Sequence, residues 1–292
     1  MRIFLDCIPC FVRQTLDSVR LITDDEQIHE QVMREALCLA CKMDLRQSPP
    51  VMAQKIHRLI RKLTGVQDPY LEIKNRFNKM ALKMYPELRE QVQASTDPFE
   101  TAIRLATAGN IIDLGVKTGL AESQVEETIV QSLTEPLDMD VLNEFRVATA
   151  QAKDILYLGD NAGEIVFDRL LIEQLPCEKI TFVVKAAPII NDATMEDAQI
   201  VGLTDIVTVI DNGSDAPGTI LGDCSQDFRD RFENADLLIA KGQGNYETLS
   251  DLDKNIFFIL KAKCPVIARD LSCEIGSLVL ARNEGGSCKE QN

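Results

Sequence analysis

Histidine is scarce in this chain. Only two, His29 and His57, occur among the 292 residues, and both lie where the apolar pattern is helical. A zinc site built from several histidines is therefore excluded. A cysteine nucleophile would need one of the same two residues as its base, which disfavours that mechanism too.

Two common nucleotide-binding motifs are also missing. The turn after the apolar run 155–158 contains Gly159 and Gly163 but no third glycine, so it is not a GxGxxG fingerprint. No Gly-Lys-Ser/Thr follows, which excludes a Walker loop there. The turn instead presents Asp160 and Asn161 at the end of a predicted strand, where open α/β sheets bind ligands. Its chemistry should be oxygen ligation.

Basic residues are few: 31 Lys and Arg stand against 46 Asp and Glu, giving a net charge of −15. An acidic surface argues against nucleic acid as a partner. No apolar run approaches the roughly 20 residues that span a membrane, and no N-terminal segment resembles a signal peptide. We expect a cytoplasmic protein without a membrane partner; the sequence carries no signal for its oligomeric state.

Nine cysteines, an odd number in a long chain, predict reduced thiols rather than a disulfide framework. Two CxxC pairs, Cys7 with Cys10 and Cys38 with Cys41, could together form a four-cysteine metal site. The second pair lies within a predicted helix on a mostly apolar face, where thiols behave as small hydrophobic groups. A redox or metal-handling role for Cys7 and Cys10 is the other alternative.

The apolar pattern changes near residue 150. Residues 1–150 predict a helical portion, and residues 151–283 alternate strand and helix patterns. This alternation is typical of an α/β fold with a mostly parallel sheet and helices on both faces. Residues 284–292 predict a flexible tail.

The alternating half predicts five strands and the helices between them. The strands are expected at Ile155–Leu158, Ile180–Val184, Ile206–Ile210, Leu237–Ala240 and Val266–Ala268. The helices are expected at Ile165–Leu175, Thr194–Val201, Gln226–Asn234 and Asn255–Lys263.

Oxygen-bearing side chains recur where the first two strands end. Asp160 and Asn161 follow the first strand, and Asp192 follows the second. Parallel strands bring such ends to one edge of a sheet. These oxygens favour Mg²⁺ or Mn²⁺ with water completing the shell. The alternative is that Asp192 caps the helix near Thr194 and that Asp160 and Asn161 form a simple turn.

Lysines stand at the ends of the second and fourth predicted strands and suggest an anion site. Lys241-Gly242-Gln243-Gly244-Asn245 follows the fourth strand, and its glycines would let backbone N–H groups approach a phosphate. The alternative is a glycine-rich turn that starts a helix. Lys185 ends the second strand and points either to the same site or to solvent.

Six ordered blocks of sequence resemble the damage-control phosphatases, formerly catalogued as domain of unknown function 89. They cover nearly the whole chain, and the N-terminal CxxC is similar to the prokaryotic stand-alone branch. The blocks are Asp6–Cys10, Ala108–Asp113, Gly159–Glu164, Pro188–Thr194, Gly213–Thr219 and Lys241–Glu247.

The resemblance implies a metal-dependent phosphatase that acts on small phosphorylated metabolites, sugar phosphates among them. It implies a Rossmann-like core beside a helical portion, with Mg²⁺, Mn²⁺, Co²⁺ or Ni²⁺ held by Asp160, Asn161 and Asp192. Asp160, Glu164 and Lys241 are the expected catalytic residues. The expected substrate-binding residues are Asn110, Asp113, Lys185, Asn191, Lys241, Gly242, Gln243, Gly244, Asn245 and Glu247.

On this hypothesis Lys241 and the glycine amides neutralise the phosphoryl oxygens, and Glu164 or Asp160 orients the attacking water. Direct attack on phosphorus by Asp160 is the alternative. Two rival functions remain open: a phosphometabolite-binding protein without catalysis, and a thiol protein that uses Cys7 and Cys10.

Overall fold

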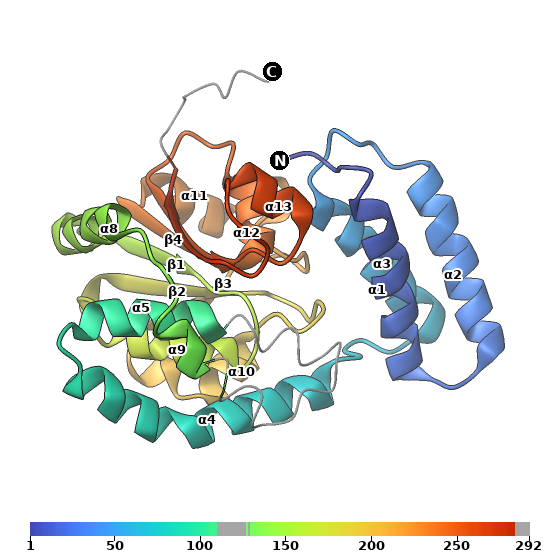
Figure 1. Cartoon of the computed structure of the whole chain (residues 1–292). Coiled ribbons are helices and arrows are strands. Elements are labelled where there is room, and N and C mark those ends of the chain that lie inside the picture. Colours follow the sequence, from blue (N-terminus) through green and yellow to red (C-terminus); the bar gives the residue numbers. More distant parts are fainter. Residues whose placement is uncertain (110–126, 128, 284–292) are drawn as a thin grey trace.

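A computed structural model of the chain describes residues 1–109, 127 and 129–283. Within this part, six strands form one sheet in the order β3-β2-β1-β4-β5-β6 (Figure 1). Strands β1 to β5 are parallel, and β6 pairs antiparallel with β5, which confirms the predicted α/β class. The strands are β1 (Ile155–Leu158), β2 (Ile180–Val184), β3 (Thr208–Asp211), β4 (Leu237–Lys241), β5 (Ile256–Lys261) and β6 (Leu278–Arg282).

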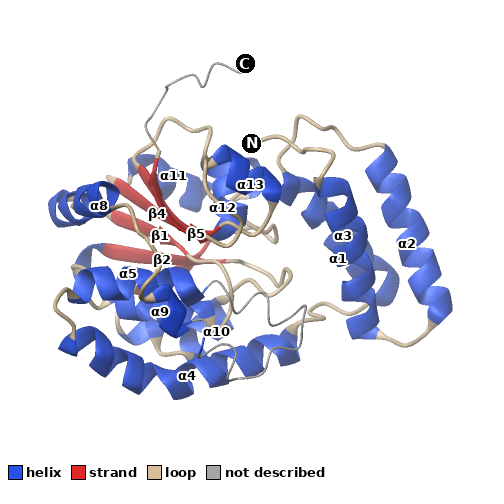
Figure 2. Ribbon diagram, in the orientation of Figure 1, coloured by secondary structure: helices blue, strands red, loops and turns tan. Residues whose placement is uncertain are grey.

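Helices cover both faces of the sheet (Figure 2). In β1, Ile155 and Tyr157 pack into the hydrophobic core on one face, whereas Leu156 and Leu158 pack into the core on the other. This continuous apolar run is what a parallel strand buried on both faces requires. The first face carries α4 (Leu71–Ala94), α5 (Pro98–Ala108), α8 (Met139–Gln151), α9 (Glu164–Ile172) and α10 (Met195–Ile200). The second face carries α11 (Gln226–Asn234), α12 (Gly242–Leu249) and α13 (Pro265–Asp270).

Two neighbouring segments have the opposite structure from the prediction. Residues 255–263, expected to be helical, contain β5, and residues 266–268, expected to be a strand, lie inside α13. The run Ile256–Leu260 is apolar at every position and buried, so it has no period that separates strand from helix. Pro265 occupies the first turn of α13, where its fixed φ suits a helix start.

The three N-terminal helices form a unit beside the sheet, at the right of Figure 1. They are α1 (Cys7–Ile22), α2 (Glu26–Cys41) and α3 (Pro49–Thr64). Their buried apolar side chains form a separate small core that includes Phe11, Val32 and Ile60. Among the described helices, none combines the length and the apolar composition needed to cross a membrane. The predicted tail, 284–292, lies outside the described residues.

Candidate active site

The carboxyl edge of the sheet gathers the predicted oxygen ligands. Asp160 and Asn161 follow β1, and an antiparallel bridge joins Asn161 to Asp192 in the loop after β2. The Ala193 N–H donates to the Asp160 carbonyl over 2.8 Å, and the Ala162 N–H donates to the Asn191 carbonyl over 2.8 Å. Backbone pairing therefore holds the two loops together and brings Asp160, Asn161 and Asp192 to one place.

The side-chain amide of Asn161 has a fixed orientation. Its Nδ2 donates to Asp160 Oδ2 and to Glu164 Oε2, each over 2.8 Å. Because two carboxylates use both amide hydrogens, the carbonyl oxygen Oδ1 lies on the opposite side of the group. An amide oxygen beside two nearly buried carboxylates is a donor set that suits a hard divalent cation.

The predicted ligand set, Asp160, Asn161 and Asp192, contains only two carboxylates. Among the described residues, no group of three or more His, Cys, Asp or Glu side chains is placed to hold a metal ion. Cys7, Cys10, Cys38 and Cys41 do not come together as such a group in the described part of the chain, so the geometry does not support the four-cysteine alternative. Burial raises the pKa of the Cys7 thiol, which lowers its reactivity.

Position 242 requires a glycine because its backbone lies directly against the Asp160 carboxylate. Its φ is +77°, and a Cβ at this position would lie 1.9 Å from Asp160 Oδ2. A Cβ at Gly244 would lie 3.0 Å from the backbone nitrogen of Gly218. The predicted glycine loop is the first turn of α12, which begins directly after β4 and brings the helix backbone against the Asp160 carboxylate.

We expect Gly242→Ala to lower the free energy of unfolding by about 2–4 kcal/mol. The left-handed φ costs an alanine roughly 1–2 kcal/mol, and the clash with Asp160 adds to this. Gly222→Ala is the matched control, because a Cβ on Gly222 would meet no atom within 4 Å in the described part of the chain. Urea unfolding measures both variants, and equal midpoints would contradict the argument.

The contacts of Lys241 differ from those expected of a direct phosphate ligand. Its side chain is 0% exposed, and Nζ donates to Glu164 Oε1 (2.7 Å), Asp168 Oδ1 (2.5 Å) and the Ala106 carbonyl (2.9 Å). These three bonds use all the ammonium hydrogens. Lys241 therefore acts on the site through Glu164, which in turn holds Asn161.

Burial and neighbouring charges shift the pKa values of Lys241 and Asp168 in this cluster. Burial lowers the pKa of Lys241, but Asp168 and Glu164 outweigh it and raise the pKa above its usual value. Burial raises the pKa of Asp168 to about 6, against the opposing effect of Lys241. The Tyr157 hydroxyl donates to Asp168 Oδ1 over 2.8 Å. Sequence reasoning missed Asp168 and Tyr157; the available signal was an aspartate one turn after Glu164 in a mostly apolar helix.

Two predicted residues lie beside Asp192. Lys185 is 3% exposed, its Nζ lies 3.6 Å from Asp192 Oδ2, and it also donates to the Gly218 carbonyl. Asn191 is buried, and its Nδ2 has no hydrogen-bond partner among the described residues. Lys185 and Asn191 therefore bring donors to the same loop as Asp192.

Three other predicted residues make contacts within the protein. Asn245 Nδ2 donates to the Lys241 carbonyl over 2.8 Å, and its Oδ1 accepts from Thr219. Gln243 Nε2 donates to Glu247 Oε1 over 3.0 Å and lies 3.6 Å from Cys264 Sγ. Burial raises the pKa of Glu247 to about 7. The predicted residues Asn110 and Asp113 lie outside the described part of the chain.

Known proteins resemble the chain over nearly its full length. Residues 3–279 match the family model described as the damage-control phosphatase ARMT1-like domain. An uncharacterized protein of Methanocaldococcus jannaschii is 39% identical over 95% of this chain and 94% of its own length. The damage-control phosphatase of Archaeoglobus fulgidus is 37% identical over 96% of this chain and 98% of its own length. The crystal structure of a DUF89 family protein from Pyrococcus horikoshii has a TM-score of 0.88 at 35% identity, covering 97% of this chain and 100% of that one.

Proposed function

Because the chain belongs to the damage-control phosphatase ARMT1-like family, we propose that it is a metal-dependent phosphatase of small phosphorylated metabolites, with sugar phosphates as the expected class. One observation carries the proposal: Asp160, Asn161 and Asp192 converge where β1 and β2 end. Two relatives that match at least 96% of the chain carry the name damage-control phosphatase.

Asp160, Asn161 and Asp192 would hold the cation. When bound, Mg²⁺, Mn²⁺, Co²⁺ or Ni²⁺ supplies positive charge for the phosphoryl oxygens. Asn161 contributes its amide oxygen, because its two N–H groups donate to Asp160 and Glu164.

Lys185 and Asn191, which lie beside Asp192, would bind the phosphoryl group. The Lys185 Nζ lies 3.6 Å from Asp192 Oδ2, and from there it can donate to a phosphoryl oxygen. The buried Asn191 amide can donate to the same group or to a sugar hydroxyl. These two residues take over the neutralising role that the sequence suggested for Lys241.

The two carboxylates proposed for catalysis are not equivalent. Glu164 is 0% exposed and joins Lys241 to Asn161, so it holds the ligand set in place. Asp160 is 8% exposed and lies at the edge of the site. Asp160 is therefore the residue that would orient the attacking water or attack phosphorus itself.

The test measures phosphate release from a panel of sugar and nucleotide phosphates, with each of the four cations added to metal-free protein. We expect turnover that disappears with EDTA and returns when the cation is restored, since without the cation the carboxylates of Asp160 and Asp192 would repel the phosphoryl group. Thermal stabilisation by a sugar phosphate without turnover under any cation would favour the non-catalytic binding protein instead.

A further inference from the structure

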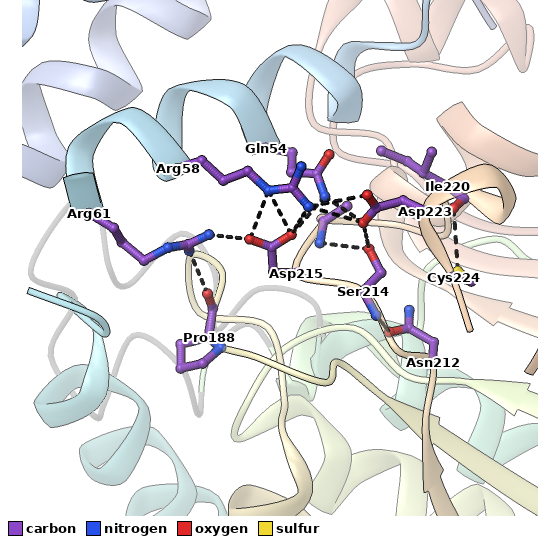
Figure 3. Close-up of polar contacts among 11 residues, drawn as sticks. Gln54, Arg58, Arg61, Pro188, Asn212, Ser214, Asp215, Ile220, Asp223 and Cys224 are labelled. Carbon is purple, nitrogen blue, oxygen red and sulfur yellow. Dashed lines mark hydrogen bonds and ion pairs between the residues drawn. The ribbon is translucent and has the colours of Figure 1, made fainter.

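One face of α3 points toward the site loops. Gln54, Arg58 and Arg61 lie at helical spacing on this face and reach the loop after β3 (Figure 3). Arg58 and Arg61 both pair with Asp215, whose carboxylate also accepts from Gln54 Nε2 over 2.8 Å. These contacts join the N-terminal helices to the carboxyl edge of the sheet.

Arg61 also reaches a second loop. Its Nη1 donates to the Pro188 carbonyl over 2.9 Å, and its Nη2 pairs with Asp215. The side chains of Arg61 and Asp215 are 16% and 15% exposed. One planar guanidinium therefore fixes the distance between the loop after β2 and the loop after β3.

Each of these loops carries part of the proposed site. Asp192 lies four residues after Pro188, and between them Ile190 has the strained φ of +45°. Such a conformation persists only where its surroundings hold it. The other loop carries the Gly218 carbonyl, which accepts from Lys185, and the Ser214 carbonyl accepts from the Ala186 N–H over 3.1 Å.

We propose that Arg61 is a positioning residue for the cation and phosphate site, an inference that rests on the proposed function. By holding the Pro188 carbonyl and the Asp215 carboxylate together, it sets Asp192 against Lys185 and maintains the backbone conformation at Ile190. Through Arg61, the N-terminal helices thereby contribute to the site.

Arg58 provides a matched control on the same helix. Its guanidinium pairs with Asp215 and with Asp223, both in the segment that follows β3, and its side chain is 48% exposed. Arg58→Gln and Arg61→Gln each remove one guanidinium from the same cluster. Only Arg61→Gln releases the loop that carries Asp192.

The test measures Mn²⁺ affinity of the full chain by calorimetry and amide exchange in residues 186–194. We expect Arg61→Gln to weaken Mn²⁺ binding about 10–100-fold, as loss of a residue that supports ligands typically does, and to accelerate exchange there. Arg58→Gln should stay within about threefold of wild type, and Arg61→Lys should recover part of the loss.

The inference is overturned if the two glutamine variants bind Mn²⁺ equally and show the same exchange in 186–194, or if the wild type binds no Mn²⁺. Phosphate release is measured on the same samples. A wild type that binds Mn²⁺ in an Arg61-dependent way but hydrolyses no substrate would overturn the proposed function and leave the positioning role supported.

Discussion

Asp160→Asn should lower phosphate release by roughly 10³-fold or more and weaken Mn²⁺ binding by about 100-fold or more. The substitution removes one of only two carboxylates in the proposed ligand set. It keeps the shape of the side chain and an oxygen that can accept from Asn161 Nδ2. The local hydrogen bonding should therefore survive while the charge that holds the cation is lost.

Asp253→Asn makes the same chemical change at the opposite edge of the sheet, on the exposed turn before β5. It should leave phosphate release and Mn²⁺ binding at the wild-type level. Circular dichroism and urea unfolding establish that both variants are folded. If folded Asp160→Asn protein hydrolyses substrate at the wild-type rate, the assignment of the site to the carboxyl edge of β1 is wrong.

The turn after β1 could be predicted because its information is local. Four apolar residues in a row indicate a buried strand, and Gly159 and Gly163 mark the turn that exposes Asp160 and Asn161. The parallel arrangement then brings Asp192 to the same edge without any knowledge of side-chain contacts.

Lys241 could not be placed in the same way. A lysine directly after a buried strand suggests a ligand for an anion, but its partners Glu164 and Asp168 lie 77 and 73 residues away in the sequence. The Lys241 ammonium binds Glu164 and Asp168 because α9 packs beside the central strands, and this packing cannot be read from the local sequence. The contact of Arg61 with Pro188, 127 residues apart, depends on tertiary structure for the same reason.

The error at β5 and α13 has a different cause. A segment that is buried on all sides needs no polar positions, so Ile256–Leu260 lost the periodic signal that secondary structure leaves in a sequence. The helix at Gln226–Asn234 is only half buried, so its sequence keeps the apolar and polar periodicity of a helix, and it was predicted correctly.

Lys241→Met should lower the free energy of unfolding by about 3–5 kcal/mol at pH 8, as expected when one partner of a buried ion pair is removed. Methionine approximates the length of the lysine side chain but leaves Glu164 and Asp168 without their cation. With Lys241 present, burial already raises the pKa of Asp168 to about 6. Removing the Lys241 ammonium should raise the pKa of Asp168 further.

The pH dependence separates charge from packing. A carboxyl whose pKa is higher in the folded than in the unfolded state favours folding at low pH, and this contribution is lost as pH rises through the folded pKa. The deficit of Lys241→Met relative to wild type should therefore be smaller at pH 5 than at pH 8. Asp168→Asn in the same background should recover part of the stability at pH 8, because it removes one uncompensated charge.

Lys79→Met on the exposed face of α4 is the control for replacing a lysine by methionine. It should change the free energy of unfolding by no more than about 0.5 kcal/mol at either pH. Urea unfolding of all three variants at pH 5 and pH 8 gives the comparison. A deficit of the same size at both pH values would assign the role of Lys241 to packing, because a cavity or a misfitted side chain has no proton to bind.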